Sequence, residues 1–236
     1  MGKLKDKTIL VTGVSKGLGL EITKTLLSKG YAVIGISRSK VVLTGRFQHL
    51  QFDLSNSEGL EEFLKSNLRN TRIDGFVNNA AIAYDDIITN MNLENLQTMY
   101  NVNVFSPLLI TKYCLRNMLL NKVKGSIVHI SSISVHTGYN GLSMYASTKG
   151  ALEAFSKNTA REWGRKGMRS NCIVAGFMET EMSGTLTDEQ KDRIYKRTSL
   201  KRPTDTNSVA NTIEFLLSDE SNSITGQNIN VDSGTI

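Results

Sequence analysis

The stretch "KTILVTGVSKGLGLEITKTLLSKG", residues 7–30, decides the fold. Residues 7–13 form a short apolar run that is rich in strand-forming side chains and stops at Gly13, which predicts a buried strand. The segment 17–30 then carries large apolar side chains near helical spacing, at Leu20, Ile22, Leu26 and Leu27. A strand that passes through a glycine-rich turn into a helix is the first half of a βαβ unit.

The same alternation continues along the chain. Further strands are predicted at 31–37, 47–55, 73–80, 125–132, 168–176 and 227–234, and helices at 57–68 (capped by Ser57), 93–120, 141–166, 187–197 and 206–218. Near-continuous apolar strands are typical of a parallel sheet that is covered on both faces. We therefore expect a doubly wound parallel seven-stranded sheet with helices on both faces, in one domain spanning residues 1–236.

One connection in this order is unusually brief. Between Ser37 and Gln48 lies only "RSKVVLTGRF", residues 38–47. A packed crossover helix needs a longer segment. We expect a loop or a single turn there.

The composition narrows the classes of function. The chain has 28 basic and 22 acidic residues, a net charge of +6, but its basic residues are spread rather than clustered. This favours a solvated basic surface or a phosphate-bearing partner over nucleic acid. The two cysteines are far apart in sequence, which argues against a disulfide framework. The three histidines are scattered and form no cluster with cysteine, so we expect no metal site. Without an apolar leader or an eighteen-residue apolar window, we expect a soluble cytoplasmic protein that does not bind membranes.

The glycine-rich turn "TGVSKGLG" predicts a dinucleotide site of the Rossmann type. Gly13, Gly17 and Gly19 would let the backbone approach a pyrophosphate at the N-terminus of the following helix. The spacing differs from the standard G-x-G-x-x-G, and an ordinary glycine-rich turn is the alternative. After the second strand, where an acidic residue would bind the ribose of NAD, stand Ser37 and Arg38. Together with Lys16 they favour the 2′-phosphate of NADP.

A candidate catalytic pair lies in "SMYASTKG", where Tyr145 precedes Lys149 by four residues. A helix brings these two side chains to one face. A nearby ammonium favours the phenolate, so we expect Lys149 to lower the pKa of Tyr145 and fit it for acid–base catalysis. Ser131 and Ser132 end the preceding strand at the carboxyl edge of the sheet, where ligands bind. A hydroxyl there could bind a carbonyl oxygen, although strand-end serines are common.

Taken together, these motifs resemble the short-chain dehydrogenase/reductases over essentially the whole chain. The shared stretches occur in the family's order: "TGVSKGLG", "NNA" at 78–80, the serine strand, "YASTK" and "ITGQNINVDSG". Within the family, "GFMETEM", "SLKRP" and "FLLSDESNSITGQ" look most like the β-ketoacyl-acyl-carrier-protein reductases.

The resemblance implies roles for particular residues. Tyr145 is expected as the proton donor and acceptor, Lys149 as the ribose-binding residue, and Ser132, rather than Ser131, as the group that polarises the carbonyl. Asn103, with Asn101 as the weaker alternative, is expected to support a water-linked proton relay. The expected cofactor-binding residues, besides Tyr145 and Lys149, are Gly13, Ser15, Lys16, Gly17, Leu18, Gly19, Ser37, Arg38, Asp53, Leu54, Asn79, Ala80, Ala81, Gly176, Met178 and Thr180.

The implied reaction is NADPH-dependent reduction of a carbonyl, most readily a 3-oxoacyl thioester on acyl carrier protein. Lys166 resembles a docking position for that acidic carrier, although a solvated helix-end lysine is the alternative. Two interpretations compete with this one. The same chemistry could act on a sugar, a steroid or a small alcohol, or the protein could be an NADP-binding scaffold without catalytic activity. The family's usual tetramer would pair the helices at 93–120 and 141–166. Ala81 and Ala175 depart from the family's glycine and proline, which affects substrate identity more than catalysis.

Overall fold

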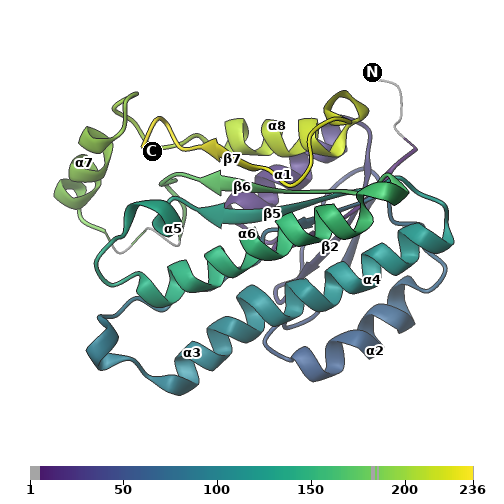
Figure 1. Cartoon of the computed structure of the whole chain (residues 1–236), viewed down its shortest axis with the longest axis horizontal. Helices are drawn as coiled ribbons and strands as arrows, with labels where there is room; N and C mark the ends of the chain where they lie inside the picture. Colours follow the sequence, from purple (N-terminus) through teal and green to yellow (C-terminus); the bar gives the residue numbers. More distant parts are fainter. Residues whose placement is uncertain (1–5, 182–183, 185, 236) are drawn as a thin grey trace.

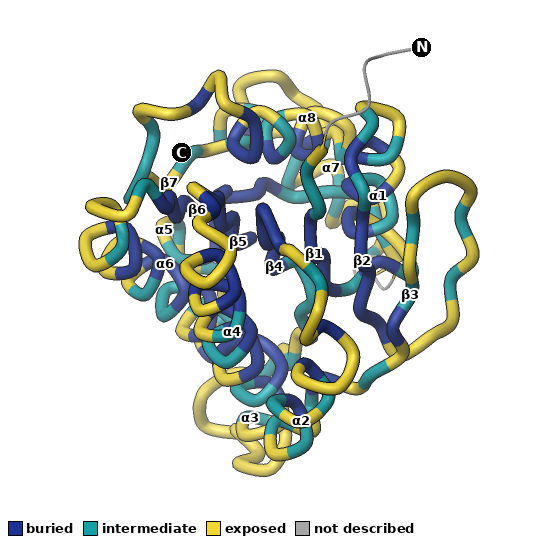
Figure 2. Tube along the Cα trace, turned by 90° about the vertical axis from the view of Figure 1, so that its right-hand side faces the viewer, coloured by how far each residue is buried: buried dark blue, intermediate teal, exposed yellow. Residues whose placement is uncertain are grey.

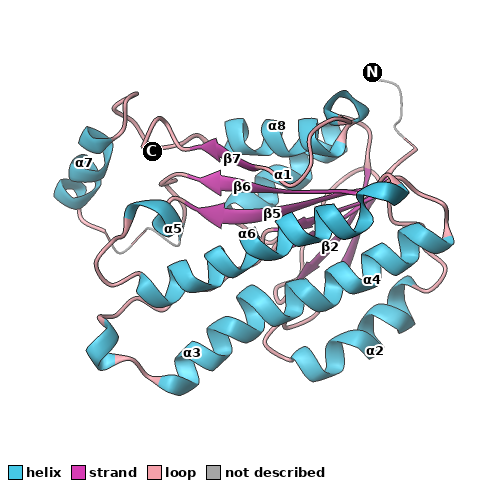
Figure 3. Cartoon of the chain, viewed as in Figure 1, coloured by secondary structure: helices cyan, strands magenta, loops and turns pink. Residues whose placement is uncertain are grey.

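The computed structural model describes residues 6–181, 184 and 186–235, and in them strands and helices alternate (Figures 1 and 3). The strands are β1 (Thr8–Thr12), β2 (Ala32–Ser37), β3 (Phe47–Gln51), β4 (Gly75–Asn78), β5 (Ser126–Ser132), β6 (Arg169–Ala175) and β7 (Asn228–Val231). The α-helices are α1 (Gly17–Ser28), α2 (Ser57–Leu68), α3 (Leu93–Tyr100), α4 (Ser106–Leu120), α5 (Ser134–Thr137), α6 (Ser143–Trp163), α7 (Asp188–Arg197) and α8 (Thr206–Leu217).

The strands form one parallel sheet in the order β3-β2-β1-β4-β5-β6-β7. Figure 2 looks along this sheet and shows α1 and α8 above it and α2, α4 and α6 below it, with the buried residues concentrated between the layers. Two apolar cores result. One lies between the sheet and helices α1 and α8, and the other lies between the sheet and helices α2 and α4. The predicted doubly wound seven-stranded sheet is confirmed.

The strand order places a crevice at the carboxyl end of β1. The chain proceeds outward from β1 to β2 and β3, and then returns to place β4 on the other side of β1. In open parallel sheets, the loops that leave such a reversal point diverge and leave room for a ligand. The glycine-rich turn follows β1, so it lies at this crevice.

Local sequence explains most of the element boundaries. Residues between β2 and β3 contain no helix, as the short connection predicts. The expected cap of α2 is wrong by one residue: Asn56 is the N-cap, and its side chain accepts a hydrogen bond from the Gly59 N–H at 3.1 Å. Ser57 is the first helical residue instead, because the amide oxygen of Asn56 already satisfies a backbone donor of the first turn.

The long helix predicted over residues 93–120 is present, but it contains a π-helical turn at Asn101–Phe105. Such turns insert one extra residue into the hydrogen-bond ladder and are frequent at functional sites. Here the turn contains the buried Asn103. The helix predicted over 141–166 is α6, followed by a 3₁₀ turn, Gly164–Lys166.

Within the described ranges, every helix is too short or too polar to cross a membrane. Cys114 and Cys172 are buried free thiols, and burial raises the pKa of both.

Candidate functional site

A cleft of about 640 Å³ opens at the carboxyl edge of the sheet. Its lining residues come from the glycine-rich turn, the ends of β2, β4 and β5, helix α6 and the segment after β6. All of the expected cofactor residues line this cleft except Gly176. The structure therefore brings together side chains that lie as far apart in sequence as Gly13 and Thr180.

The glycine-rich turn is shaped by its lack of side chains. Gly13 and Gly17 have φ angles of 74° and 52°, in the region that favours glycine. A Cβ on Gly19 would lie 2.0 Å from the Gly13 carbonyl oxygen, so the turn and the start of α1 pack too closely for any side chain. α1 also has no acidic residue in its first turn. This is a cradle in which the N-terminus of α1 can receive an anion.

The segment after β4 holds the other side of that turn. Asn79 Nδ2 donates to the Thr12 carbonyl at 3.0 Å and to the Gly13 carbonyl at 3.3 Å. Ala81 follows, where the family usually has glycine, and its φ is not positive. The extra methyl group therefore causes no backbone strain.

At the far end of the cleft lie the residues expected to select the cofactor. The Ser37 hydroxyl donates to the Ser39 carbonyl at 2.9 Å and lies 2.8 Å from His49 Nε2. Arg38 is exposed beside it, and Asp53 lines the same end. Lys16 Nζ lies 2.5 Å from Glu181 Oε2, a pairing that the sequence did not indicate.

Tyr145 and Lys149 line the opposite end, where the ammonium lies 5.5 Å from the centre of the tyrosine ring. Lys149 is only 2% exposed, and its Nζ donates to the Ile130 carbonyl at 2.8 Å. Burial lowers the pKa of Lys149 to about 8. One helix face thus presents a phenol and a buried amine to the cleft.

The expected effect of Lys149 on Tyr145 is not seen in the protein alone. Burial, and secondarily the Asp85 carboxylate, raise the pKa of Tyr145. Removal of the phenol from water disfavours its charged phenolate form, and the negative charge of Asp85 disfavours it further. Tyr145 is therefore held as the neutral phenol, the form that can give up a proton.

Asn103 lies behind this pair rather than on the cleft wall. Its Oδ1 accepts from the Ile82 N–H at 2.9 Å, and its Nδ2 donates to the Ile82 carbonyl at 2.9 Å and to Thr148 Oγ1 at 3.1 Å. The π-helical turn thereby connects the segment after β4 to α6, beside Lys149. Asn101 is outside this set of contacts, which favours Asn103 of the two candidates.

The two serines at the end of β5 point to different surroundings. Ser131 is buried and donates to Glu153 Oε1 at 2.5 Å, so its hydroxyl serves the packing. Ser132 Oγ accepts from the Ser134 N–H at 3.2 Å and from Ser134 Oγ at 3.0 Å, which leaves its own proton for another acceptor. Ser132 is the serine suited to a ligand, although it lies just outside the residues that line the cleft.

Glu153 is a residue that sequence reasoning missed. It is 9% exposed, and besides Ser131 it accepts from Asn228 Nδ2 at 2.7 Å and lies 3.1 Å from His136 Nε2. It lies four residues beyond Lys149 and therefore on the same helix face. A carboxylate at that spacing was the available signal, but its partners on β5, α5 and β7 are brought to it only by the fold.

Comparison with known proteins agrees with this geometry. Residues 13–235 match a family model described as enoyl-(acyl carrier protein) reductase. 3-Oxoacyl-acyl-carrier-protein reductase FabG of Escherichia coli (strain K12) is 32% identical over 238 residues, covering 98% of this chain and 97% of that protein. The chain belongs to the short-chain dehydrogenase/reductase family. It is thereby an enzyme of an oxidoreductase family.

Solved structures of other short-chain dehydrogenase/reductases have the same fold. A 4-hydroxyisoleucine dehydrogenase complexed with NADH superposes with a TM-score of 0.92 at 26% identity, covering 98% of each chain. ElxO with NADP bound gives a TM-score of 0.89 at 28% identity, covering 98% of this chain and 99% of that one.

A further relative in sequence is the uncharacterized oxidoreductase YmfI of Bacillus subtilis (strain 168), which is 31% identical over 241 residues, 97% of this chain and 98% of that protein.

Two residues at the end of β6, Ala175 and Gly176, lie outside the cleft lining. Gly176 follows β6, and a Cβ there would lie 2.3 Å from Thr204 Oγ1, so this glycine permits close packing and does not line the cleft. Ala175 is buried at the end of β6 and pairs with Val231 of β7. Next to it, the Gly176 N–H donates to the Val231 carbonyl at 3.0 Å and continues the ladder between β6 and β7.

Proposed function

We propose that this enzyme uses NADPH to reduce a carbonyl to an alcohol, with a 3-oxoacyl thioester on acyl carrier protein as its substrate. The observation that carries the proposal is the Tyr145–Lys149 pair on the wall of a cleft whose other end contains Arg38 and Lys16. The similarity to FabG proteins over nearly the whole chain supports the choice of thioester.

The cleft residues fit an NADP molecule. The glycine cradle at the N-terminus of α1 would receive the pyrophosphate, and Arg38 with Lys16 the 2′-phosphate. Asp53 would lie at the adenine, and Asn79, Met178 and Thr180 toward the nicotinamide half. When bound, the cofactor supplies the hydride that reduces the carbonyl carbon.

The chain's own residues then handle the oxygen and its proton. Ser132, whose hydroxyl proton is not used by its two contacts to Ser134, donates a hydrogen bond to the carbonyl oxygen. Tyr145, held neutral by burial, donates its proton to the same oxygen. Lys149, with a pKa near 8, can return a proton toward Tyr145, and Asn103 binds the hydroxyl of the neighbouring Thr148.

The test is a steady-state panel of thioester, sugar and steroid ketones with NADPH and NADH. We expect fastest turnover with a 3-oxoacyl thioester and NADPH, and its loss in Tyr145→Phe. Unchanged turnover in Tyr145→Phe would contradict the role of Tyr145 as the proton donor. The likeness to a 4-hydroxyisoleucine dehydrogenase makes a small hydroxy acid the second candidate, and its oxidation by the enzyme together with no reduction of the thioester would favour it.

A carrier protein would dock at the end of α6. Arg161, Arg165 and Lys166 are exposed and line one surface groove with Trp163 and a single carboxylate, Glu162, so that three cations face one acidic group. Acyl carrier protein is acidic, and such a cluster would attract it. We expect Lys166→Glu to raise KM for the carrier-bound substrate while leaving KM for a short pantetheine thioester unchanged. An equal change for both substrates would argue against docking at this groove.

We also propose that the enzyme is a homotetramer built on α4 and α6. Phe105, Leu119 and Leu120 leave apolar surface exposed along the long helix, to 50%, 45% and 83%. Sedimentation equilibrium tests the assembly, and a monomer at micromolar concentration would contradict it.

A further inference from the structure

The ion pair between Lys16 and Glu181 joins two distant segments that line the cleft. Lys16 precedes the first residue of α1, and Glu181 follows β6; their charged atoms are 2.5 Å apart. The same segments meet a second time, since a Cβ on Gly17 would lie 3.6 Å from the side chain of Thr180. The ion pair is therefore part of a wider contact between the glycine-rich turn and the segment after β6.

Glu181 places a carboxylate where the protein otherwise favours an external anion. The N-terminus of α1 carries partial positive charge, Lys16 adds a full one, and Arg38 lines the same cleft. A phosphate monoester carries about −1.5 to −2 charges at neutral pH and three acceptor oxygens. It is therefore a stronger partner for Lys16 than a single carboxylate, but the two anions compete for the same ammonium.

We propose that Glu181 is a selectivity residue that competes with the 2′-phosphate of the cofactor for Lys16. Binding of NADPH displaces the carboxylate, whereas binding of NADH leaves the ion pair in place. Glu181 thus reduces the preference for the phosphorylated cofactor below what Lys16 and Arg38 alone would give. The inference rests on the proposed assignment of the 2′-phosphate to Lys16.

The experiment measures equilibrium binding of adenosine 2′,5′-bisphosphate and of 5′-AMP by calorimetry, so that turnover plays no part. Exposed ion pairs are weak, and both side chains are more than 60% exposed, so we expect Glu181→Gln to tighten bisphosphate binding about two- to fivefold. Binding of 5′-AMP should stay unchanged. The gain should shrink in high salt, because exposed charges are screened. It should vanish in a Lys16→Ala background.

Glu179 provides a matched control in the same segment. Its carboxylate accepts from the Tyr195 hydroxyl of α7 at 2.6 Å and so has a different partner. If Glu179→Gln tightens bisphosphate binding as much as Glu181→Gln does, the effect is a general change of charge and the inference is wrong. The inference is also wrong if Glu181→Gln changes the binding of the bisphosphate and of 5′-AMP equally, or if it changes the binding of neither.

A separate arm tests the assignment on which the inference rests. If Lys16→Ala and Arg38→Ala each weaken bisphosphate and 5′-AMP equally, the proposed 2′-phosphate site fails, and Glu181 has nothing to compete with. If they weaken only the bisphosphate while Glu181→Gln is silent, the site stands and the selectivity role of Glu181 is overturned.

Discussion

Arg169 and Lys149 are both buried cations, but they serve opposite edges of the parallel sheet. Arg169 is the first residue of β6, at the edge where the strands begin, whereas Lys149 reaches the carboxyl end of β5. Burial lowers the pKa of each. Their different surroundings show which polar groups of this fold maintain it and which are left for chemistry.

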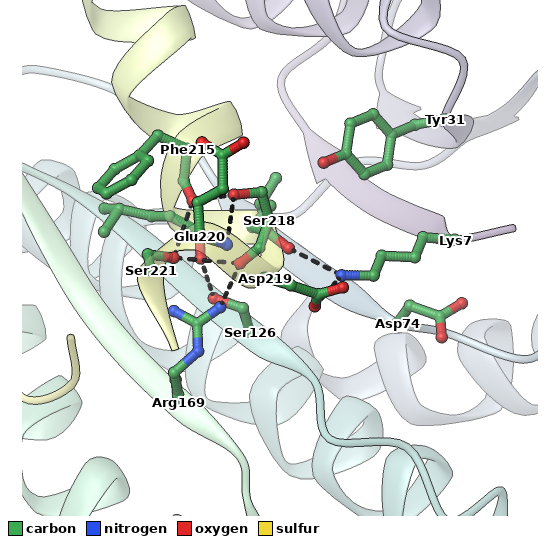
Figure 4. Close-up of polar contacts among 12 residues, drawn as sticks. Lys7, Tyr31, Asp74, Ser126, Arg169, Phe215, Ser218, Asp219, Glu220 and Ser221 are labelled. Atoms are coloured by element: carbon green, nitrogen blue, oxygen red, sulfur yellow. Dashed lines mark hydrogen bonds and ion pairs between the residues drawn. The ribbon is translucent and has the colours of Figure 1, made fainter. Parts of the chain in front are cut away.

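At the edge where the strands begin, polar side chains donate hydrogen bonds to backbone carbonyls of the protein itself. Arg169 Nη2 donates to the Ser218 carbonyl at 3.0 Å, and Nη1 to the Ile224 carbonyl at 3.4 Å. Figure 4 shows the guanidinium against the segment that follows α8, with Ser126 and Ser221 beside it. The Ser126 hydroxyl donates to the Leu216 carbonyl at 2.7 Å. These contacts fix the loop after α8 to the sheet.

The carboxyl edge leaves its cation facing a cavity. Lys149 Nζ bonds to the Ile130 carbonyl, and both residues line the cleft together with Tyr145. An ammonium has three donors, and one backbone acceptor uses only one of them. We therefore expect Arg169 to stabilise the fold, whereas Lys149 is available for the catalytic role proposed above.

The largest expected effect is the loss of turnover in Lys149→Met. Acid–base groups typically contribute about 10²–10⁴-fold, so NADPH oxidation should fall by at least about 10²-fold. The unfolding midpoint at pH 7 should not fall markedly. Methionine keeps the apolar stem, and removal of a charge that burial disfavours offsets the lost hydrogen bond to the Ile130 carbonyl. Differential scanning fluorimetry measures that midpoint. A marked drop in the midpoint would make Lys149 a structural cation like Arg169 and break the comparison.

The pH dependence of stability should report the same buried amine. The pKa of Lys149 is about 8 in the folded protein and 10.5 for an ordinary lysine, so between these values the unfolded chain binds more protons. The free energy of unfolding should rise as pH increases from about 8 to 10.5, by up to about 3 kcal/mol, and this term should be flat below pH 8.

Urea titrations at pH 7, 8, 9 and 10 measure this rise in the wild type and in Lys149→Met. Other groups titrate in both proteins, so the difference between the two curves isolates the lysine. Parallel curves would mean that the amine is solvated through the cleft.

The contrast between the edges also explains how much the sequence could predict. The glycine-rich turn and the Tyr145–Lys149 pair are local patterns, each contained in fewer than ten residues, and the fold places both as expected. Alternating apolar segments likewise predict a doubly wound parallel sheet, since right-handed connections leave few topologies. These features depend on chain-local geometry, which sequence spacing reports directly.

The features that were missed depend on contacts between distant segments. Lys16 and Glu181 are separated by 165 residues, and Glu153 gathers partners from β5, α5 and β7. The direction of the pKa shift at Tyr145 was also expected wrongly, because spacing shows that Lys149 is near but not how far the phenol is removed from water. Burial and long-range pairing follow from packing, which no single motif contains.

At the opposite edge, Arg169→Met should destabilise the protein without impairing catalysis. The change removes two hydrogen bonds, although the Ser218 carbonyl keeps Ser221 Oγ at 3.2 Å and the Ile224 carbonyl keeps Asn171 Nδ2 at 2.9 Å as donors. At about 0.5–1.5 kcal/mol for each lost hydrogen bond, the total cost is about 1–3 kcal/mol. We expect the free energy of unfolding to fall by about that amount in urea. At a temperature where the variant stays folded, kcat should match the wild type within about twofold. A larger loss of kcat would show that the starting edge influences the cleft.

The smallest expected effect is that of Lys7→Met, which tests whether burial, rather than location at this edge, makes Arg169 important. Lys7 lies at the same edge and pairs with Asp219 at 2.6 Å, but the Asp219 side chain is 81% exposed. Water screens such a pair, so its loss should cost at most about 1 kcal/mol, and less in high salt. The free energy of unfolding at low and high salt measures this directly. If Lys7→Met costs as much as Arg169→Met, then the ion pair holds the segment after α8 to the sheet, and the carbonyl contacts of Arg169 are secondary.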